Sequence, residues 1–191
     1  LMVRRVASFF KKHNLERNNC VAVLSLNDWK LLPIYYSASA ASLVVLNLNI
    51  RLSIKELAYI VEDATPVWII ADDSMIDMAR QLEYAKVYSL NELVSLGCEG
   101  VPDDDTSLNT VDAPLDGSLL LTSDADYMMY YTSGTTGRPK GVRLTNRNVF
   151  THALNTIKEF EFNSEDVWAH FAPMYHLVDA YAIFSMTWVG G

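Results

Sequence analysis

A run rich in hydroxyl and glycine residues has the composition of a phosphate-binding loop. It reads YTSGTTGRPKGV, from Tyr131 to Val142, and begins at the end of the apolar segment Tyr127–Thr132. Glycines allow backbone conformations with positive φ and a close approach to a ligand, while backbone N–H groups and hydroxyls donate hydrogen bonds to phosphate oxygens. Lys140 adds a mobile positive charge. The run therefore predicts a site for a polyphosphate group.

This loop differs from the usual P-loop of nucleotide hydrolases. Lys140 lies six residues after Gly134, as in that motif. Pro139, however, stands where the motif has its second glycine, and Gly141 stands where it has the Ser or Thr that binds magnesium. Without those two residue types the P-loop geometry is lost, so the sequence disfavours a nucleotide hydrolase.

The order of the twelve residues from Tyr131 to Val142 closely resembles the phosphate-loop signature of the adenylate-forming (AMP-binding) superfamily. This superfamily includes acyl-CoA synthetases, aryl-CoA ligases, beetle luciferases and the adenylation domains of peptide synthetases. Two further stretches are similar to family segments: residues 40–63, where a strand and a short loop ending in an Arg precede a helix, and the turn Pro173-Met174-Tyr175-His176. The resemblance is greatest to acyl-CoA synthetases and runs from about residue 20 to residue 191.

The resemblance implies a reaction and a set of site residues. A carboxylate, from a fatty or aryl acid, would attack the α-phosphorus of ATP to give an acyl-adenylate and pyrophosphate, and coenzyme A would then form a thioester. Implied cofactors are ATP, Mg²⁺ and coenzyme A. Lys140 and His176 would be the catalytic residues, with His176 bordering the acyl pocket, and no metal ligand is assigned. The implied cofactor-binding residues are Thr132, Ser133, Gly134, Thr135, Thr136, Gly137 and Lys140.

Alternatives remain open at this point. The protein could load its acyl group onto a carrier protein, act like a luciferase, or be a truncated pseudoenzyme that binds nucleotide without turnover. Residues 177–181 depart from the usual glycine-containing continuation of the family, so the acyl class stays open. Within them, Asp179 either binds a polar group of the substrate or begins a helix.

Three basic residues of the glycine-rich segment, Lys140, Arg138 and Arg143, are expected to create a local positive potential that attracts ATP.

The surrounding elements alternate between strands and helices. Strands are predicted at residues 21–26, 42–48, 67–71, 86–90, 127–132 and 167–172. Helices are predicted at residues 28–41, where Pro33 must lie in the first turn, at 53–63, where Ser53 and Glu56 form a capping box, and at 145–160. Such alternation indicates an α/β fold with a mostly parallel sheet flanked by helices, here an incomplete part of the large N-terminal domain of an adenylate-forming enzyme.

Composition narrows the class of protein. A net charge of -8 over 191 residues excludes binding to nucleic acid by general phosphate attraction. Cys20 and Cys98 show no disulfide or zinc spacing, and no apolar run approaches the roughly 20 residues of a membrane helix. We expect an intracellular protein, cytoplasmic or organellar and not secreted.

Four tryptophans, Trp29, Trp68, Trp168 and Trp188, are expected to fill helix–sheet contacts. His13, His152 and His170 have no metal-ligand spacing.

One stretch interrupts the alternation. Residues 97–126 are acidic and contain no Lys or Arg, which favours a loop or linker inside a single partial domain spanning residues 1–191. No later acidic motif, ribose-binding motif or C-terminal domain with a catalytic lysine is found in the sequence. We therefore expect the chain to be inactive alone, and its oligomeric state stays open.

Overall fold

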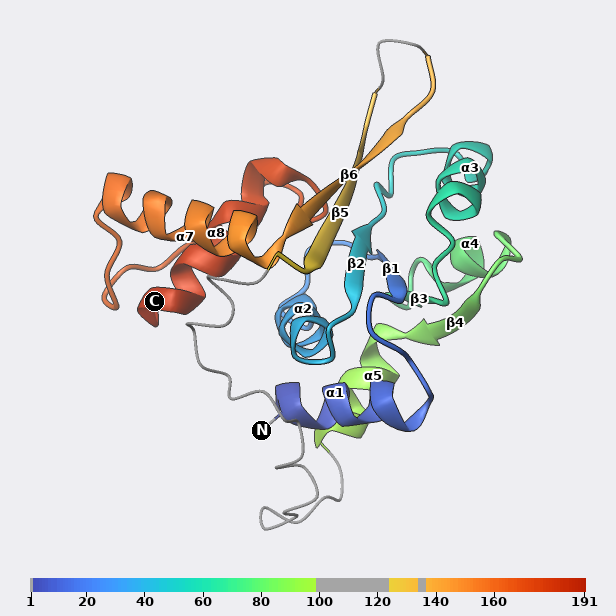
Figure 1. The fold of residues 1–191 in the computed structure, drawn as a ribbon, viewed down its shortest axis with the longest axis horizontal. Helices are drawn as coiled ribbons and strands as arrows, with labels where there is room; N and C mark the ends of the chain where they lie inside the picture. Colours follow the sequence, from blue (N-terminus) through green and yellow to red (C-terminus); the bar gives the residue numbers. More distant parts are fainter. Residues whose placement is uncertain (1, 99–123, 134–136) are drawn as a thin grey trace.

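One six-stranded sheet organises the protein (Figure 1). The computed structural model describes residues 2–98, 124–133 and 137–191. Across the sheet the strand order is β4-β3-β1-β2-β5-β6. Neighbours are parallel except β5 and β6, which form an antiparallel hairpin. The strands are β1 (Cys20–Leu24), β2 (Val44–Asn47), β3 (Trp68–Ala71), β4 (Lys86–Ser89), β5 (Asp126–Thr132) and β6 (Lys140–Thr145). The predicted α/β fold is confirmed.

The middle of the sheet is apolar on both faces. Every residue of β1, β2 and β3 is buried. β1 aligns Cys20 with Val44 of β2 and Val21 with Trp68 of β3. Strands buried on both faces read as continuous apolar runs, which is why the sequence predicted them.

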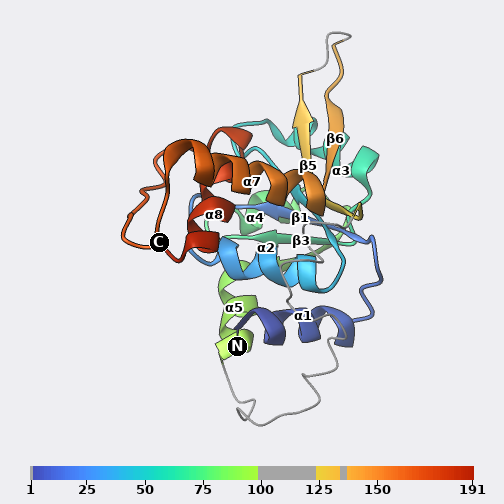
Figure 2. The ribbon, with the colours of Figure 1, turned by 60° about the vertical axis from the view of Figure 1, so that its left-hand side comes forward.

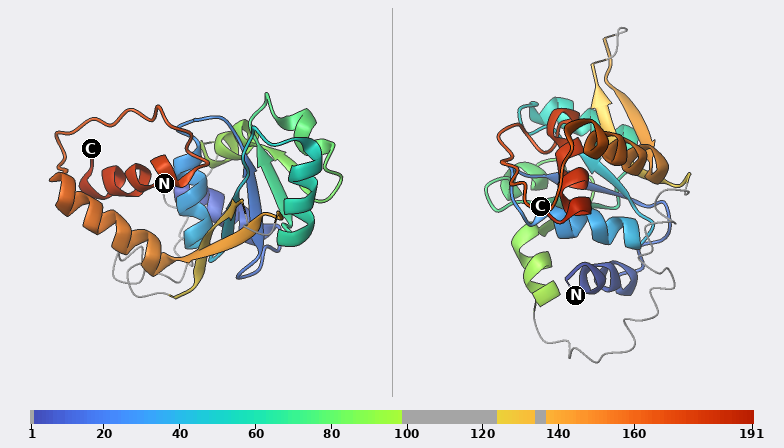
Figure 3. Two further views of the ribbon diagram at one scale, coloured as in Figure 1. Left: turned by 90° about the horizontal axis from the view of Figure 1, so that it is seen from above. Right: turned by 90° about the vertical axis from the view of Figure 1, so that its left-hand side faces the viewer.

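Helices cover both faces (Figures 2 and 3). One face packs against α1 (Met2–Lys12), α2 (Leu31–Ala40), α5 (Leu90–Cys98), α7 (Asn146–Phe160) and α8 (Leu177–Val189). The other packs against α3 (Ile54–Ala64) and α4 (Ile76–Arg80). The chain moves from β1 to β2 and then crosses back to β3, so right-handed crossovers place α2 and α3 on opposite faces.

The predicted helix signals have the expected geometry. Glu56 donates its backbone N–H to Ser53 Oγ at 3.3 Å, and the Glu56 carboxylate accepts from the backbone N–H of Ser53 at 2.8 Å. This capping box begins α3, as predicted. Pro33 is the third residue of α2 and so lies in its first turn.

Two predictions about strands were wrong or incomplete. Residues 167–172 form no strand in the structure, and Val167 and Phe171 are 95% and 94% exposed. Their apolar and aromatic types favour a strand, but the sheet ends at β6 and this segment is not paired with it. Conversely, β6 was not predicted, because its glycine and charged residues have low strand propensity and only pairing with β5 makes it a strand.

The prediction that the tryptophans fill helix–sheet contacts was partly right, and most of the predicted acidic loop lies outside the described residues. Trp68 is buried in the core, as predicted, whereas Trp29 and Trp188 are 60% and 40% exposed. Trp168 is half-buried. Of the predicted loop 97–126, residues 99–123 lie outside the described residues, Gly97 and Cys98 end α5, and Asp126 begins β5.

Candidate functional site

The candidate site lies at the carboxyl edge of the parallel sheet. β2 ends there at Asn47 and β5 ends there at Thr132. The chain also reverses its direction of travel across the sheet after β2, since β3 lies on the far side of β1. In open α/β sheets, ligands bind outside the carboxyl ends of strands near such a reversal. The topology therefore favours ligand binding at this edge of the sheet, where β5 leads into the glycine-rich loop.

The β5–β6 hairpin carries the glycine-rich loop and extends well beyond the other strands (Figure 1). Thr132 pairs with Lys140 at the base of the loop. Gly137 has a φ of 85°, a left-handed conformation that favours glycine, and a Cβ there would meet nothing within 4 Å. The backbone conformation at this position therefore requires a glycine, although there is room for a larger side chain. Gly134, Thr135 and Thr136 lie outside the described residues.

A cleft of about 440 Å³ opens beside this hairpin. Its described walls come from the end of β2, from α3, from the hairpin and from the turn before α8. The lining residues are Asn47, Asn49, Leu52, Glu56, Ile60, Tyr130, Tyr131, Thr132, Ser133, Pro139, Tyr175, His176 and Leu177. Thr132 and Ser133 thus line the same cavity as His176, which is distant from them in the sequence. Lys140 and Gly137 are exposed and are not among its described lining residues.

His176 lies on the turn that begins α8. The backbone N–H of Val178 donates to His176 Nδ1 at 3.2 Å, so the imidazole acts as the N-cap of the helix. The side chain is exposed toward the cleft that it lines. His176 therefore both caps α8 and lines the cleft.

A buried polar network supports the floor of the cleft and was not predicted. The hydroxyl of Tyr35 donates to Asn47 Oδ1 at 2.7 Å, and the hydroxyl of Tyr127 donates to the Tyr35 carbonyl at 3.0 Å. Burial raises the pKa of Tyr35 well above its ordinary value, so the phenol stays neutral and keeps donating. A single Asn at the end of the apolar run of β2 was the signal that sequence reasoning overlooked.

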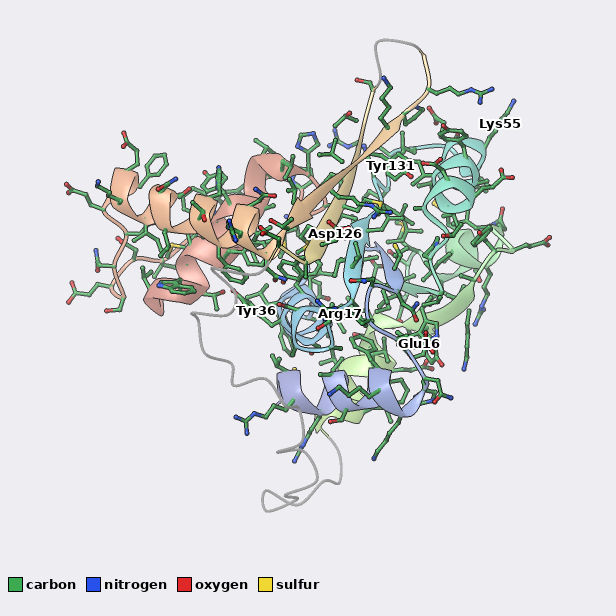
Figure 4. The ribbon with its side chains drawn as sticks, viewed as in Figure 1. Glu16, Arg17, Tyr36, Lys55, Asp126 and Tyr131 are labelled. Atoms are coloured by element: carbon green, nitrogen blue, oxygen red, sulfur yellow. The ribbon has the colours of Figure 1, made fainter. Side chains whose placement is uncertain are left out.

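Tyr131 fixes the base of the loop against α3. Its hydroxyl donates to Asp63 Oδ2 at 2.5 Å, and Figure 4 places its side chain between the hairpin and α3. Burial, and then the hydrogen bond to Asp63, raise the pKa of Tyr131 above its ordinary value. The Tyr131 ring also packs on Gly141, where a Cβ would lie 3.1 Å from ring carbons. Gly141 therefore provides space for this ring.

Arg143 does not belong to the expected cationic cluster. β6 runs antiparallel to β5, so Arg143 lies opposite Met129, three residues below the pairing of Lys140 with Thr132. Its guanidinium pairs with Asp126 at 3.0 Å and lines a different pocket, at the amino ends of the strands. The expectation that Arg143 helps to focus charge on ATP is wrong, because strand direction carries it away from the loop.

Asp179 is occupied by partners within the chain. It lies in the first turn of α8, is 2% exposed, and accepts a hydrogen bond from Trp168 Nε1 at 3.3 Å. Its other oxygen lies 2.6 Å from His170 Nδ1. Both partners of the carboxylate come from residues 168–170, which this contact ties to α8. The geometry favours the helix-start interpretation of Asp179 over substrate recognition.

The whole chain can be compared with known protein families. The family profile described as "AMP-binding enzyme" matches residues 1–191. The chain belongs to the AMP-binding enzyme family.

Curated relatives of this chain include CoA ligases. The 2-succinylbenzoate–CoA ligase of Bacillus cereus is 29% identical over 85% of this chain and 30% of the relative. The 3-methylmercaptopropionyl-CoA ligase of Ruegeria pomeroyi is 30% identical over 91% of this chain and 34% of the relative. The chain thus spans about a third of the length of these relatives.

Solved structures share the fold. The O-succinylbenzoate coenzyme A synthetase of Bacillus subtilis, solved with ATP and magnesium ion, matches with a TM-score of 0.77 and 20% identity. The match covers 99% of this chain and 47% of that one. The chain therefore has the fold of part of the large N-terminal domain of adenylate-forming enzymes.

Two hydroxyl-bearing residues of the glycine-rich loop, Thr132 and Ser133, line the cleft. Hydroxyl side chains are residue types that can donate hydrogen bonds to phosphate oxygens. Within the described ranges, no group of three or more His, Cys, Asp or Glu side chains is arranged so that it could hold a metal ion. In the part of the chain that the structure describes, no helix is both long and apolar enough to cross a membrane.

Proposed function

We propose that the protein containing this chain is an AMP-forming acyl-CoA ligase. A carboxylate oxygen of the substrate attacks the α-phosphorus of ATP, and the bond to the bridging oxygen of pyrophosphate breaks. The sulfur of coenzyme A then attacks the acyl carbon, with loss of the thiol proton and departure of AMP. We also propose that the protein is intracellular, in the cytoplasm or in an organelle.

The cleft between the glycine-rich loop and His176 is the observation that carries this proposal. The start of the loop, at Thr132 and Ser133, and the turn at His176 line the same cavity. A reaction between ATP and a carboxylate requires a phosphate site and an acid site to adjoin, because the reacting oxygen and phosphorus must approach to about 3–3.5 Å.

The loop would bind the departing pyrophosphate. In this proposal the hydroxyls of Thr132, Ser133, Thr135 and Thr136 and backbone N–H groups at Gly134 and Gly137 donate to phosphate oxygens. Lys140, exposed opposite Thr132, adds positive charge where negative charge develops. A magnesium ion bound with ATP would supply further charge neutralisation, and no residue of this chain is assigned to it.

The other side of the cleft would bind the acid. Tyr130, Tyr175 and Leu177 give it an apolar and aromatic surface beside His176. This surface fits a fatty or aryl acid, with His176 orienting the carboxylate or shaping its pocket and taking no part in proton transfer. Coenzyme A is favoured as acceptor over a carrier protein because the relatives above are CoA ligases.

Pyrophosphate exchange tests the proposal directly. The complete protein is incubated with ATP, magnesium and labelled pyrophosphate, together with short-chain, medium-chain and aryl acids in turn. The proposal predicts label in ATP only when a suitable carboxylate is present. Exchange that is absent with every acid, while ATP still binds, would contradict it and favour a nucleotide-binding pseudoenzyme.

A further inference from the structure

We infer that Asn27 is a positioning residue that holds the turn carrying His176 against the sheet. The inference rests on the proposed function for its effect on substrate, but its structural part stands on hydrogen bonds within the chain. Asn27 lies in the loop that follows β1, at the same carboxyl edge as the cleft.

Three hydrogen bonds join the Asn27 side chain to one distant segment. Its Nδ2 donates to the carbonyls of His170 and Ala172, each at 2.8 Å. Its Oδ1 accepts from the backbone N–H of Met174, also at 2.8 Å. These partners lie 143 to 147 residues away in sequence. One side chain thus satisfies two carbonyls and one N–H of a segment that does not pair with the sheet.

The held segment continues directly into the candidate site. The backbone N–H of His176 donates to the carbonyl of Pro173 at 3.0 Å, which closes a tight turn around Met174. His176 then caps α8 through its contact with the N–H of Val178. Met174 is 2% exposed, so the middle of the turn is also anchored in the core. A movement at Met174 would therefore move His176.

Few side chains could replace Asn27. The contacts need two N–H donors and one acceptor on a short planar group, and an amide has both. Aspartate keeps the acceptor but directs a carboxylate at two carbonyls, and alanine removes all three bonds. Asn27 itself is exposed, so these substitutions leave the apolar core intact.

The test compares Asn27→Ala with Asn19→Ala in the complete protein. Asn19 is a matched control: it lies immediately before β1, and its Oδ1 accepts from the backbone N–H of Glu16 at 2.8 Å, at the opposite edge of the sheet. Hydrogen exchange of the Met174 and His176 amides is measured first. KM values for the carboxylate and for ATP follow, from pyrophosphate exchange.

Asn27→Ala should speed exchange of the Met174 amide at least about 10-fold, because its acceptor is gone. The carboxylate KM should rise about 10-fold while the ATP KM changes less than about twofold. Asn19→Ala should change neither. If Asn27→Ala fails to fold, Asn27→Asp should raise the carboxylate KM by a smaller factor.

Unchanged amide exchange at Met174 in Asn27→Ala would overturn the inference, as would equal rises in both KM values. If the wild-type protein shows no carboxylate-dependent exchange of pyrophosphate, the proposed function fails. The amide measurement still decides whether Asn27 holds the turn.

Discussion

The hydroxyl of Tyr131 donates a hydrogen bond to Asp63 across 68 residues of sequence. Tyr131 is the penultimate residue of β5, at the start of the glycine-rich loop, and Asp63 lies in the last turn of α3. The contact therefore joins the protruding hairpin to a helix packed on the body of the sheet. A loop that must meet phosphate oxygens with fixed geometry gains from such an anchor, because misplacement by 1 Å can cost about 10²-fold in rate.

Removing this hydroxyl should weaken the fold modestly. Tyr131→Phe keeps the ring against Gly141 and loses the hydrogen bond, which predicts a fall of about 0.5–1.5 kcal/mol in the free energy of unfolding at pH 7. Urea unfolding measures it, with Tyr84→Phe, at an exposed tyrosine, as control.

The effect should depend on pH with a definite sign. The folded protein raises the pKa of Tyr131 above its ordinary value of 10.0, through burial and then the Asp63 hydrogen bond. The stability gained from the protonated phenol is complete below pH 10 and is lost as pH rises beyond it. The difference between wild type and Tyr131→Phe should therefore shrink above pH 10, and a constant difference would contradict this cause.

Gly141 and Gly137 should differ in the reason for their glycine. Gly141→Ala would place a methyl 3.1 Å from the Tyr131 ring, with an expected cost of about 1–3 kcal/mol, and Tyr131→Ala should relieve it. Gly137→Ala should cost about 1–2 kcal/mol through its backbone conformation, with or without the Tyr131 ring. Double-mutant cycles from denaturant unfolding separate the two, and additivity of Gly141→Ala with Tyr131→Ala would refute the packing explanation.

Lys140 should matter for activity and not for stability. Its side chain is exposed, so Lys140→Ala should leave the unfolding transition unchanged. Loss of one positioned charge at a developing anion predicts a pyrophosphate exchange rate lower by about 10²–10³-fold. Lys158→Ala, at an exposed lysine in the last turn of α7, is the control. A normal exchange rate in Lys140→Ala would remove this lysine from the mechanism.

His176 should show two separable roles. His176→Ala removes the N-cap of α8 and should cost about 1 kcal/mol of stability, whereas His176→Asn keeps an acceptor for the Val178 N–H and should cost less. Both variants should raise the carboxylate KM far more than the ATP KM. Measured melting temperatures and KM values decide, and full recovery of carboxylate affinity in His176→Asn would indicate a capping role alone.

Local sequence was enough to predict much of the fold. Strands such as Val44–Asn47 are short apolar runs, and the Ser53–Glu56 capping box forms within four residues. Their physical causes, burial on both faces and satisfaction of helix-end N–H groups, act between near neighbours and so are visible in a pattern. The order of hydroxyls, glycines and Lys140 likewise predicted phosphate binding from residue chemistry alone.

Tertiary structure decided what depends on distant partners. β6 is a strand because it pairs with β5, and that pairing turns Arg143 away from the loop toward Asp126. Residues 167–172 have strand-like types, yet Asn27 binds the carbonyls of His170 and Ala172, and the Asp179 carboxylate contacts Trp168 and His170. The Asn27 bonds span 143 and 145 residues of sequence, and the direction of Arg143 follows from strand pairing, so no local propensity encodes either. His176 likewise lines the same cleft as Thr132 and Ser133 only because the chain is folded.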